Sequence, residues 1–332
     1  MFSFLRDTMV NTPIALSRTI ISLWIGIQVY KPQVTSLSSL RNNYIMAYEN
    51  KTWADNQMKK AQNKCKEYTQ YACQYQTPDV EDSHMDRILN GEYVSAGMLP
   101  HMAFIFTPLW NCSASLISEK FVMAAAHCTS DIVCAEGKVK IKLGSLDKTN
   151  DGTGRWYGVD HIYEHPYFKY VGSLPHDIAL IELSETVRFN RNIRPICLNT
   201  NHDISKYNSA IAAGWGRTEH GKTNFLKMVE LRLKDSHCDE FLQDIEYLDA
   251  AKSYTIRISE YQKNTCGGDS GGSLQVLIND TCPNMYEQIG VNTQSSNSEC
   301  SLNSDANCGV YAKVARYVPW IASIVWPEEE GP

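Results

Sequence analysis

The sequence lacks the features that mark proteins of several functional classes. Its 31 Lys and Arg against 37 Asp and Glu give a net charge of -6. Without a basic surplus, we expect no nucleic-acid partner. None of the 11 cysteines is in a CxxC pair, and the 9 histidines lack zinc-finger spacing, so we expect no metal and no cofactor. The sequence also contains no repeat and no low-complexity tract.

The N-terminal region lacks an apolar run of comfortable membrane-spanning length. Residues 19–27 read TIISLWIGI and follow Arg6 and Arg18. A run of this length is typical of a secretory signal, so residues 1–30 are predicted to be a signal peptide, although no small-x-small cleavage site follows. A buried helix, or an anchor over residues 19–29, is the alternative.

The cysteine content also indicates a secreted protein. Scattered cysteines suit disulfides and an oxidising environment, so we expect a secreted, extracellular protein without stable membrane association. The expected glycosylation sites are Asn50, Asn111 and Asn279.

The composition and strand pattern of the chain change near residue 88. Residues 31–87 are polar and poor in strand pattern, with a candidate short helix over residues 56–75. Residues 88–326 carry short β-branched or aromatic segments separated by turn residues, which predicts an all-β sandwich or barrel. A final helix over residues 315–326 and an acidic tail over residues 327–332 complete the chain. The apolar face of this helix comprises Val318, Ile321, Ile324 and Val325.

The most informative stretch is KNTCGGDSGGSL, residues 263–274, in which four glycines surround Ser270. A serine hydroxyl becomes a nucleophile when a base takes its proton and donors hold the oxyanion that forms. Flanking glycines let the backbone approach a substrate closely, so the amides of Gly268 and Ser270 are candidate oxyanion donors. The alternatives are a flexible turn or a phosphate loop. A phosphate loop would need Gly-Lys-Ser/Thr, which this stretch does not contain.

Candidate partners for this serine lie elsewhere in the chain. His127 ends the apolar segment MAAAHC, where it is either a rigidly held base or an ordinary core histidine. Asp177 opens the strand-like DIALIEL, where it either orients a histidine or caps a turn. Spacing alone does not join these residues.

The motifs AAHC, HDIAL, GWG and CGGDSGGSL occur in this order. Together they resemble the trypsin/chymotrypsin-type serine proteases from Ile88 to about Trp326. The resemblance implies two six-stranded antiparallel β-barrels with a C-terminal helix. It also implies His127 as general base, Asp177 as its orienting acid and Ser270 as nucleophile.

A narrower likeness lies in LPHMAFI, SEKFVMAAAHC and WIASIVWP. These segments resemble insect clip-domain proteases of the snake type, which act in extracellular zymogen cascades of immunity and development. The likeness implies a protein substrate such as a downstream zymogen, and an inhibitor of the serpin type.

The resemblance also implies a mode of activation. Cleavage after Arg87 would free Ile88, whose α-amino group pairs with Asp269 in the family, and an arginine at this bond implies a trypsin-like activating protease. The disulfides implied by the resemblance are Cys112–Cys128, Cys266–Cys300, and Cys197 with either Cys65 or Cys73.

The chain departs from the family in its cysteines. A clip domain needs six of its own, but only Cys65 and Cys73 precede Ile88, so residues 31–87 are expected to lack a full clip domain. Cys238 lacks its usual partner in the segment TIRISEYQKN. The pairing therefore stays open for Cys134, Cys238, Cys282 and Cys308.

The residues of the expected specificity pocket also depart from the family pattern. Asn264 stands where trypsin-like members carry an aspartate, so a bound guanidinium would lose a charge-assisted hydrogen bond of about 1.5–3 kcal/mol. We therefore expect a preference that is not strictly Arg or Lys. The other residues assigned to this pocket are Thr293, Gln294, Ser295 and Gly309. Asp147 and Asp151 are either calcium-loop ligands or solvated turn acids.

These observations predict a secreted serine endopeptidase zymogen. The alternative is a non-catalytic serine protease homologue that acts as a regulatory binding protein. The presence of both His127 and Ser270 favours the enzyme.

Overall fold

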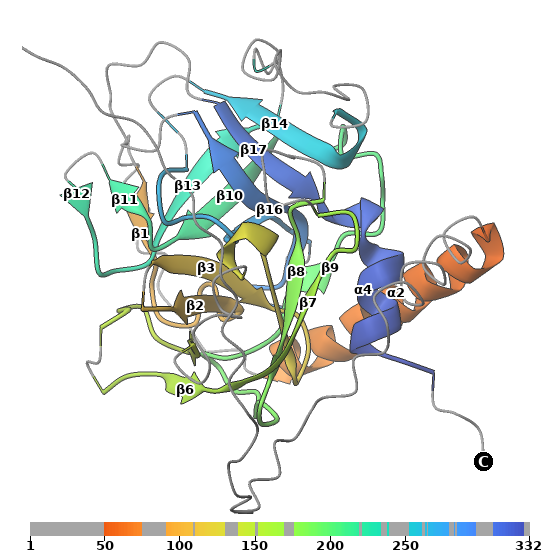
Figure 1. The fold of residues 1–332 in the computed structure, drawn as a ribbon, viewed down its shortest axis with the longest axis horizontal. Helices are drawn as coiled ribbons and strands as arrows, with labels where there is room; N and C mark the ends of the chain where they lie inside the picture. The colour runs from red at the N-terminus through yellow and green to blue at the C-terminus, as the bar shows by residue number, and fades with distance from the viewer. Residues whose placement is uncertain are drawn as a thin grey trace, which may run out of the picture.

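The computed structural model describes most of the chain from residue 50 to residue 328. The described ranges are 50–74, 91–108, 110–129, 139–149, 152–168, 176–218, 221–233, 238, 252–260, 263, 265–278, 282, 284–296 and 308–328. In this part, two antiparallel sheets lie against each other and a helix near each end of the described chain packs on one side (Figure 1). The predicted all-β class with a C-terminal helix is confirmed.

The first sheet has the order β6-β5-β2-β3-β4-β8-β7. Its strands are β2 (Met102–Phe106), β3 (Asn111–Leu116), β4 (Phe121–Ala124), β5 (Lys140–Leu143), β6 (Arg155–Tyr157), β7 (Val159–Glu164) and β8 (Ala179–Leu183). Only Gly158 separates β6 from β7, yet these two strands pair with opposite edges of the sheet. The sheet is therefore a barrel of six strands, one of which is broken at Gly158.

The second sheet is built on six strands in the order β13-β10-β15-β16-β17-β14. Their bounds are β10 (Ser209–Gly214), β13 (Lys227–Arg232), β14 (Thr255–Ser259), β15 (Ser273–Leu277), β16 (Tyr286–Ser295) and β17 (Cys308–Lys313). Two short strands, β1 (Glu92–Tyr93) and β9 (Cys197–Leu198), add to β13 and β16. A separate hairpin consists of β11 (Arg217–Thr218) and β12 (Gly221–Lys222).

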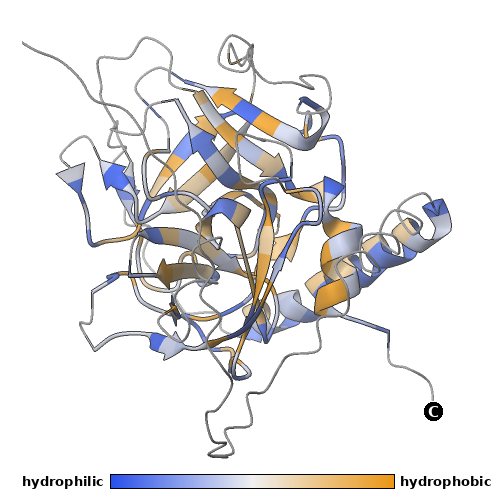
Figure 2. Cartoon of the chain, in the orientation of Figure 1, coloured by the Kyte–Doolittle hydropathy of each residue, from blue (hydrophilic) through white to orange (hydrophobic). Residues whose placement is uncertain are grey.

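Each sheet encloses apolar side chains. Ile105, Leu143 and Leu180 are fully buried in the first sheet, and Leu274 and Ile289 are buried in the second. Orange, apolar segments run through the strands in the middle of the molecule (Figure 2). Burial of this apolar surface is the main force that holds the two sheets in shape.

The C-terminal helix α4 (Val318–Val325) follows the short 3-10 helix η3 (Val314–Arg316). Val318, Ile321 and Val325 are buried as the periodicity predicts, whereas Ile324 is only partly buried.

The N-terminal helix α2 (Lys51–Gln74) begins five residues before the expected helix and runs beside α4 (Figure 1). The Asn50 side chain caps it by accepting a hydrogen bond from the Trp53 amide at 3.2 Å. Lys60 Nζ donates to the Trp326 carbonyl at 2.9 Å, and the Tyr68 ring packs edge-on against Phe189. No helix of the described part combines the length and the apolar character needed to cross a bilayer.

Disulfides fasten α2 to the sheets at two points. Cys65 is joined to Cys197, and Cys73 is joined to Cys282. The sequence left the partner of Cys197 and that of Cys282 open, and the helix places one cysteine against each.

The remaining pairings also follow from the fold. Cys112 is joined to Cys128, as the resemblance implies. Cys238 is joined to Cys308, the first residue of β17, which lies opposite Ser259 of β14. Cys266 is disulfide-bonded, while its expected partner Cys300, like Cys134, lies outside the described residues.

A matched pair of leucines tests this packing. Leu180 is fully buried in β8, whereas Leu277 in β15 is 50% exposed. We expect Leu180→Ala to lower the free energy of unfolding by about 2–5 kcal/mol, and Leu277→Ala to change it by about 0.5 kcal/mol or less. Urea unfolding of both variants measures the difference, and equal losses would contradict the assignment of Leu180 to the core.

Candidate active site

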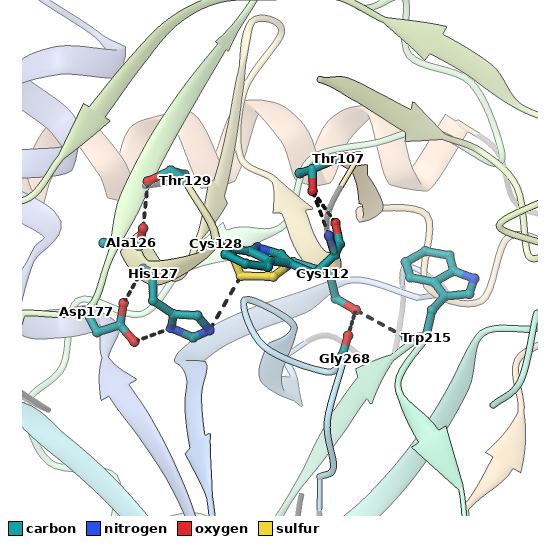
Figure 3. The surroundings of a disulfide bond; sticks show 11 residues. Thr107, Cys112, Ala126, His127, Cys128, Thr129, Asp177, Trp215 and Gly268 are labelled. Atoms are coloured by element: carbon teal, nitrogen blue, oxygen red, sulfur yellow. Dashed lines mark hydrogen bonds and ion pairs between the residues drawn. A yellow bond between two sulfur atoms is a disulfide. The ribbon is translucent and has the colours of Figure 1, made fainter. Parts of the chain in front are cut away.

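Strand pairing brings His127 and Asp177 together. β4 and β8 are antiparallel, with Ala124 opposite Ala179, so the residues that follow β4 meet those that precede β8. The 3-10 helix η1 (Ala126–Cys128) then turns the chain at His127. Asp177 Oδ2 lies 2.7 Å from His127 Nδ1, and Asp177 Oδ1 accepts a hydrogen bond from the His127 amide at 2.9 Å (Figure 3).

This contact determines which ring nitrogen of His127 can act as a base. The Asp177 side chain is 8% exposed, whereas that of His127 is 38% exposed. A carboxylate facing Nδ1 keeps the proton of the neutral ring on that nitrogen. Nε2 therefore carries the lone pair and can act as the base. It belongs to His127, the more exposed of the two side chains.

The residue before Asp177 is held by an aromatic cluster that the sequence gave no reason to expect. The His176 ring stacks on His165, with centroids 4.8 Å apart, and the His176 amide donates to the Tyr317 hydroxyl at 3.1 Å. Burial lowers the pKa of His176 to about 4. His176 is therefore uncharged near neutral pH.

The Cys112–Cys128 disulfide lies on the other side of the His127 ring (Figure 3). Cys128 Sγ is 3.7 Å from His127 Nε2. The possible ligand atoms of Cys112, His127 and Cys128 lie within 4.8 Å of one another, but the two sulfurs are bonded to each other and are not thiolate ligands. The cluster is therefore a covalent link between β3 and η1.

Ser270 is held beside these residues by its backbone. Its carbonyl accepts a hydrogen bond from the Ser113 amide at 2.9 Å, and the Gly271 amide donates to the Asn292 carbonyl at 2.7 Å. A Cβ on Gly271 would overlap the Ser113 carbonyl and lie 3.1 Å from the Ala125 nitrogen. The serine thus sits where the second sheet meets β3 and the end of β4.

Two of the glycines around the serine have a role that was not expected. Gly271 and Gly272 allow close approach of neighbouring strands. A Cβ on Gly272 would overlap the Ala213 carbonyl, and Gly271 has a φ of 80°. Only glycine fits both the space and the backbone conformation at Gly271.

The two expected oxyanion donors lie in the tight turn that carries the serine. Gly268 has a φ of 97°, and the Asp269 amide turns back to the Cys266 carbonyl at 3.0 Å. Within the described residues, neither the Gly268 amide nor the Ser270 amide donates to another protein group.

Asp269, the residue before the serine, is partly buried as a whole residue, and its carboxyl group points into the protein. Its Oδ1 accepts from the Gly216 amide at 2.8 Å, and its Oδ2 accepts from the Cys266 amide at 2.9 Å. Burial raises the pKa of Asp269 to about 6, while these two hydrogen bonds and the charge of Lys148 act in the opposite direction. The site therefore favours a positive partner for this carboxylate.

The GWG motif, residues 214–216, provides the space for Asp269. A Cβ on Gly214 would overlap Asp269 Oδ1, and a Cβ on Gly216 would overlap the carboxyl group. Sequence reasoning used this motif only as a family marker, although its two glycines at the end of a strand signalled a close approach.

The pocket residues expected from the sequence lie along β16 and β17. Thr293 is buried and donates to the Val310 carbonyl at 2.9 Å, while Gln294 is exposed. Ser295 is partly buried opposite Gly309. Asn264 lies outside the described residues.

Two further residues of this region were missed. The Thr265 hydroxyl lies 3.3 Å from the hydroxyl of the fully buried Tyr311. Thr265 adjoins Asn264 in the sequence, which could have pointed to it, whereas only strand pairing places Tyr311 there.

The other expected site residues lie apart from this centre. Asn50 and Asn111 are exposed, as glycosylation requires, and Asp147 Oδ1 accepts from the Thr149 amide within its own turn. The expected residues that lie outside the described part are Arg87, Ile88, Asp151 and Asn279.

The comparisons with known proteins agree with this geometry. The sequence profile of the family described as Trypsin matches residues 88–321. The chain is 32% identical to "CLIP domain-containing serine protease C9" of Anopheles gambiae over 286 residues, which cover 78% of this chain and 74% of that protein. It is 27% identical to "Serine protease snk" of Drosophila melanogaster over 73% of this chain and 57% of that one.

A third relative has a more specific name. "Phenoloxidase-activating factor 1" of Holotrichia diomphalia is 28% identical over 284 residues, 73% of this chain and 71% of that protein. The profile match covers most of the chain, from the expected activation site to helix α4. The chain therefore belongs to the trypsin family and is a serine endopeptidase.

Proposed function

We propose that this protein is a secreted protease zymogen that hydrolyses peptide bonds through an acyl-enzyme at Ser270. The observation that carries the proposal is the double contact of Asp177 with the amide and the ring of His127. The same arrangement argues against a non-catalytic regulatory homologue, because it orients His127 as a base.

The proposed chemistry runs through an acyl-enzyme. His127 Nε2 takes the proton of the Ser270 hydroxyl as its oxygen attacks the substrate carbonyl, and Asp177 stabilises the imidazolium that forms. The carbonyl oxygen becomes an oxyanion held by the amides of Gly268 and Ser270. His127 then gives its proton to the leaving amine, and water, activated by the same histidine, releases the acyl group.

Cleavage after Arg87 is the proposed switch. The new amino group of Ile88 would supply the positive partner that the buried Asp269 favours. The raised pKa of Asp269, about 6, supports this role, since a cation would hold the carboxylate in its charged form at neutral pH. An activating protease of trypsin-like specificity would make the cut.

The proposed domains follow from this switch. Residues 1–30 would be removed as a signal, residues 31–87 would become a light chain without a full clip domain, and residues 88–326 would form the catalytic domain, followed by the acidic tail 327–332. The light chain would remain attached through α2, whose two disulfides reach Cys197 and Cys282.

We also propose the setting and the substrate class. Disulfide bonds throughout the described part suit an extracellular protein, and the names of two relatives refer to a clip domain and to phenoloxidase activation. A protein substrate in an extracellular cascade of immunity or development, with an inhibitor of the serpin type, fits these observations. The neutral Asn264 argues for a preference other than strict Arg or Lys.

Active-site labelling tests the proposed function. After cleavage at Arg87, a fluorophosphonate probe should label the protein, because the probe reacts with an activated serine. Ser270→Ala should abolish labelling, and Ser209→Ala, which removes a hydroxyl bonded to Glu230 at the surface, should retain it. Failure of the correctly cleaved protein to react would overturn the proposal.

Non-reducing electrophoresis tests the attachment of the light chain. Because two disulfides hold α2, the chains cleaved after Arg87 should stay joined in Cys65→Ser and in Cys73→Ser. Only the double variant should release the light chain. Release from either single variant would show that the other disulfide does not form.

A charge change tests the specificity proposal. Asn264→Asp restores an anion in the pocket and should raise kcat/KM for substrates with Arg before the cleaved bond by about 10-fold to 150-fold, the equivalent of about 1.5–3 kcal/mol. Asn63→Asp, the same change on the exposed face of α2, is the control. A cleavage profile of the unaltered protein that strongly selects Arg would contradict the proposal.

A further inference from the structure

We propose that Lys148 is a positioning residue that, with Ser113, fastens the GWG turn against Asp269 before Arg87 is cleaved. The uncleaved chain would then keep a measurable part of the reactivity of Ser270. The inference rests on the proposed function, since it takes Ser270 as the nucleophile and the cut as the switch.

Lys148 and Asp269 are joined through a single peptide group. Lys148 Nζ donates to the Trp215 carbonyl at 3.2 Å, and the Gly216 amide of the same peptide group donates to Asp269 Oδ1 at 2.8 Å. A cation on the carbonyl polarises the group and strengthens the hydrogen bond that its N–H donates. Lys148 thus supports the carboxylate without touching it.

The segment that carries Lys148 is itself fixed to the loop that follows the turn. The Lys148 amide donates to the Asn224 carbonyl at 2.9 Å, and Trp215 Nε1 donates to the Leu146 carbonyl at 3.0 Å. The neighbouring Lys142 Nζ donates to the Asp147 carbonyl at 2.8 Å. The backbone at Asp147 and Lys148 is therefore fixed by hydrogen bonds, and it fixes the point from which the Lys148 side chain reaches the Trp215 carbonyl.

Ser113 secures the same turn from the side of β3. Its fully buried hydroxyl accepts from the Trp215 amide at 3.2 Å and donates to the Gly268 carbonyl at 3.4 Å. Its own amide donates to the Ser270 carbonyl at 2.9 Å. One residue thus links the GWG turn to both proposed oxyanion residues.

The charges around Asp269 agree with this role. The charge of Lys148 lowers the pKa of Asp269 against the effect of burial. Burial and the charge of Lys222 lower the pKa of Lys148, while Asp269 and Asp147 raise it. Tyr311 also faces Asp269, and its pKa is raised chiefly by burial. None of these contacts requires a free amino group at Ile88.

The experiment compares uncleaved and cleaved forms of the full chain. Arg87→Gln blocks the activating cut, and the rate of fluorophosphonate labelling at Ser270 is measured in this background and in the cleaved protein. The phosphoryl oxygen of the probe occupies the oxyanion position, so the rate reports on the loop. Each form carries Lys148→Met, Lys148→Arg or, as a matched control, Lys222→Met, which removes a nearby exposed lysine.

The uncleaved chain should label at a measurable rate, and Lys148→Met should slow it about 10-fold or more, as expected for loss of a charge-assisted hydrogen bond. In the cleaved chain, Lys148→Met should slow labelling about three-fold at most, because the Ile88 amine then supplies the charge. Lys148→Arg should restore most of the rate in the uncleaved chain, and Lys222→Met should leave it unchanged. Labelling of the cleaved Lys148→Met protein also shows that this variant folds.

Three outcomes would overturn the inference. If the cleaved protein labels and the uncleaved protein does not, the inference fails while the proposed function stands. If Lys148→Met slows both forms equally, Lys148 has only a general structural role. If neither form labels, the proposed function fails and the inference fails with it.

Discussion

The buried carboxylate of Asp269 is the constraint around which the catalytic region is arranged. It has two backbone donors, Gly216 and Cys266, and its position excludes a Cβ at Gly214 and at Gly216. A charge in such a place is costly unless it is hydrogen-bonded and paired. The loop that carries the serine therefore depends on groups from distant parts of the chain.

The two sheets supply complementary halves of the site. The first provides His127 and Asp177 from the facing ends of β4 and β8. The second provides the serine loop, in which β3 leaves no room for a side chain at Gly271 and β10 leaves none at Gly272. Since Cys112 on β3 is bonded to Cys128 beside His127, the strand that receives Ser270 is also tied to the base.

Much of the fold was predictable from the strand pattern. The short β-branched and aromatic segments of residues 88–326 predicted the all-β class, and the C-terminal helix followed from its apolar period. The strands β13 and β14 were not distinguished in the sequence, because each carries few buried apolar side chains, Met228 and Leu231 in β13 and Ile256 and Ile258 in β14. The length of α2 was underestimated for a related reason, since its contacts with α4 and its two disulfides join residues far apart in the sequence.

The sequence by itself determined the chemistry that the chain offers, namely a serine among glycines, a histidine at a strand end and an acid before another strand. The tertiary structure decided which of these groups meet, because only the antiparallel pairing of β4 with β8 joins His127 to Asp177. It also decided that Cys238 pairs with Cys308 on β17, and that Ser113 and Lys148 hold the GWG turn. Contacts of this kind depend on distances between strands and loops, and sequence spacing does not contain those distances.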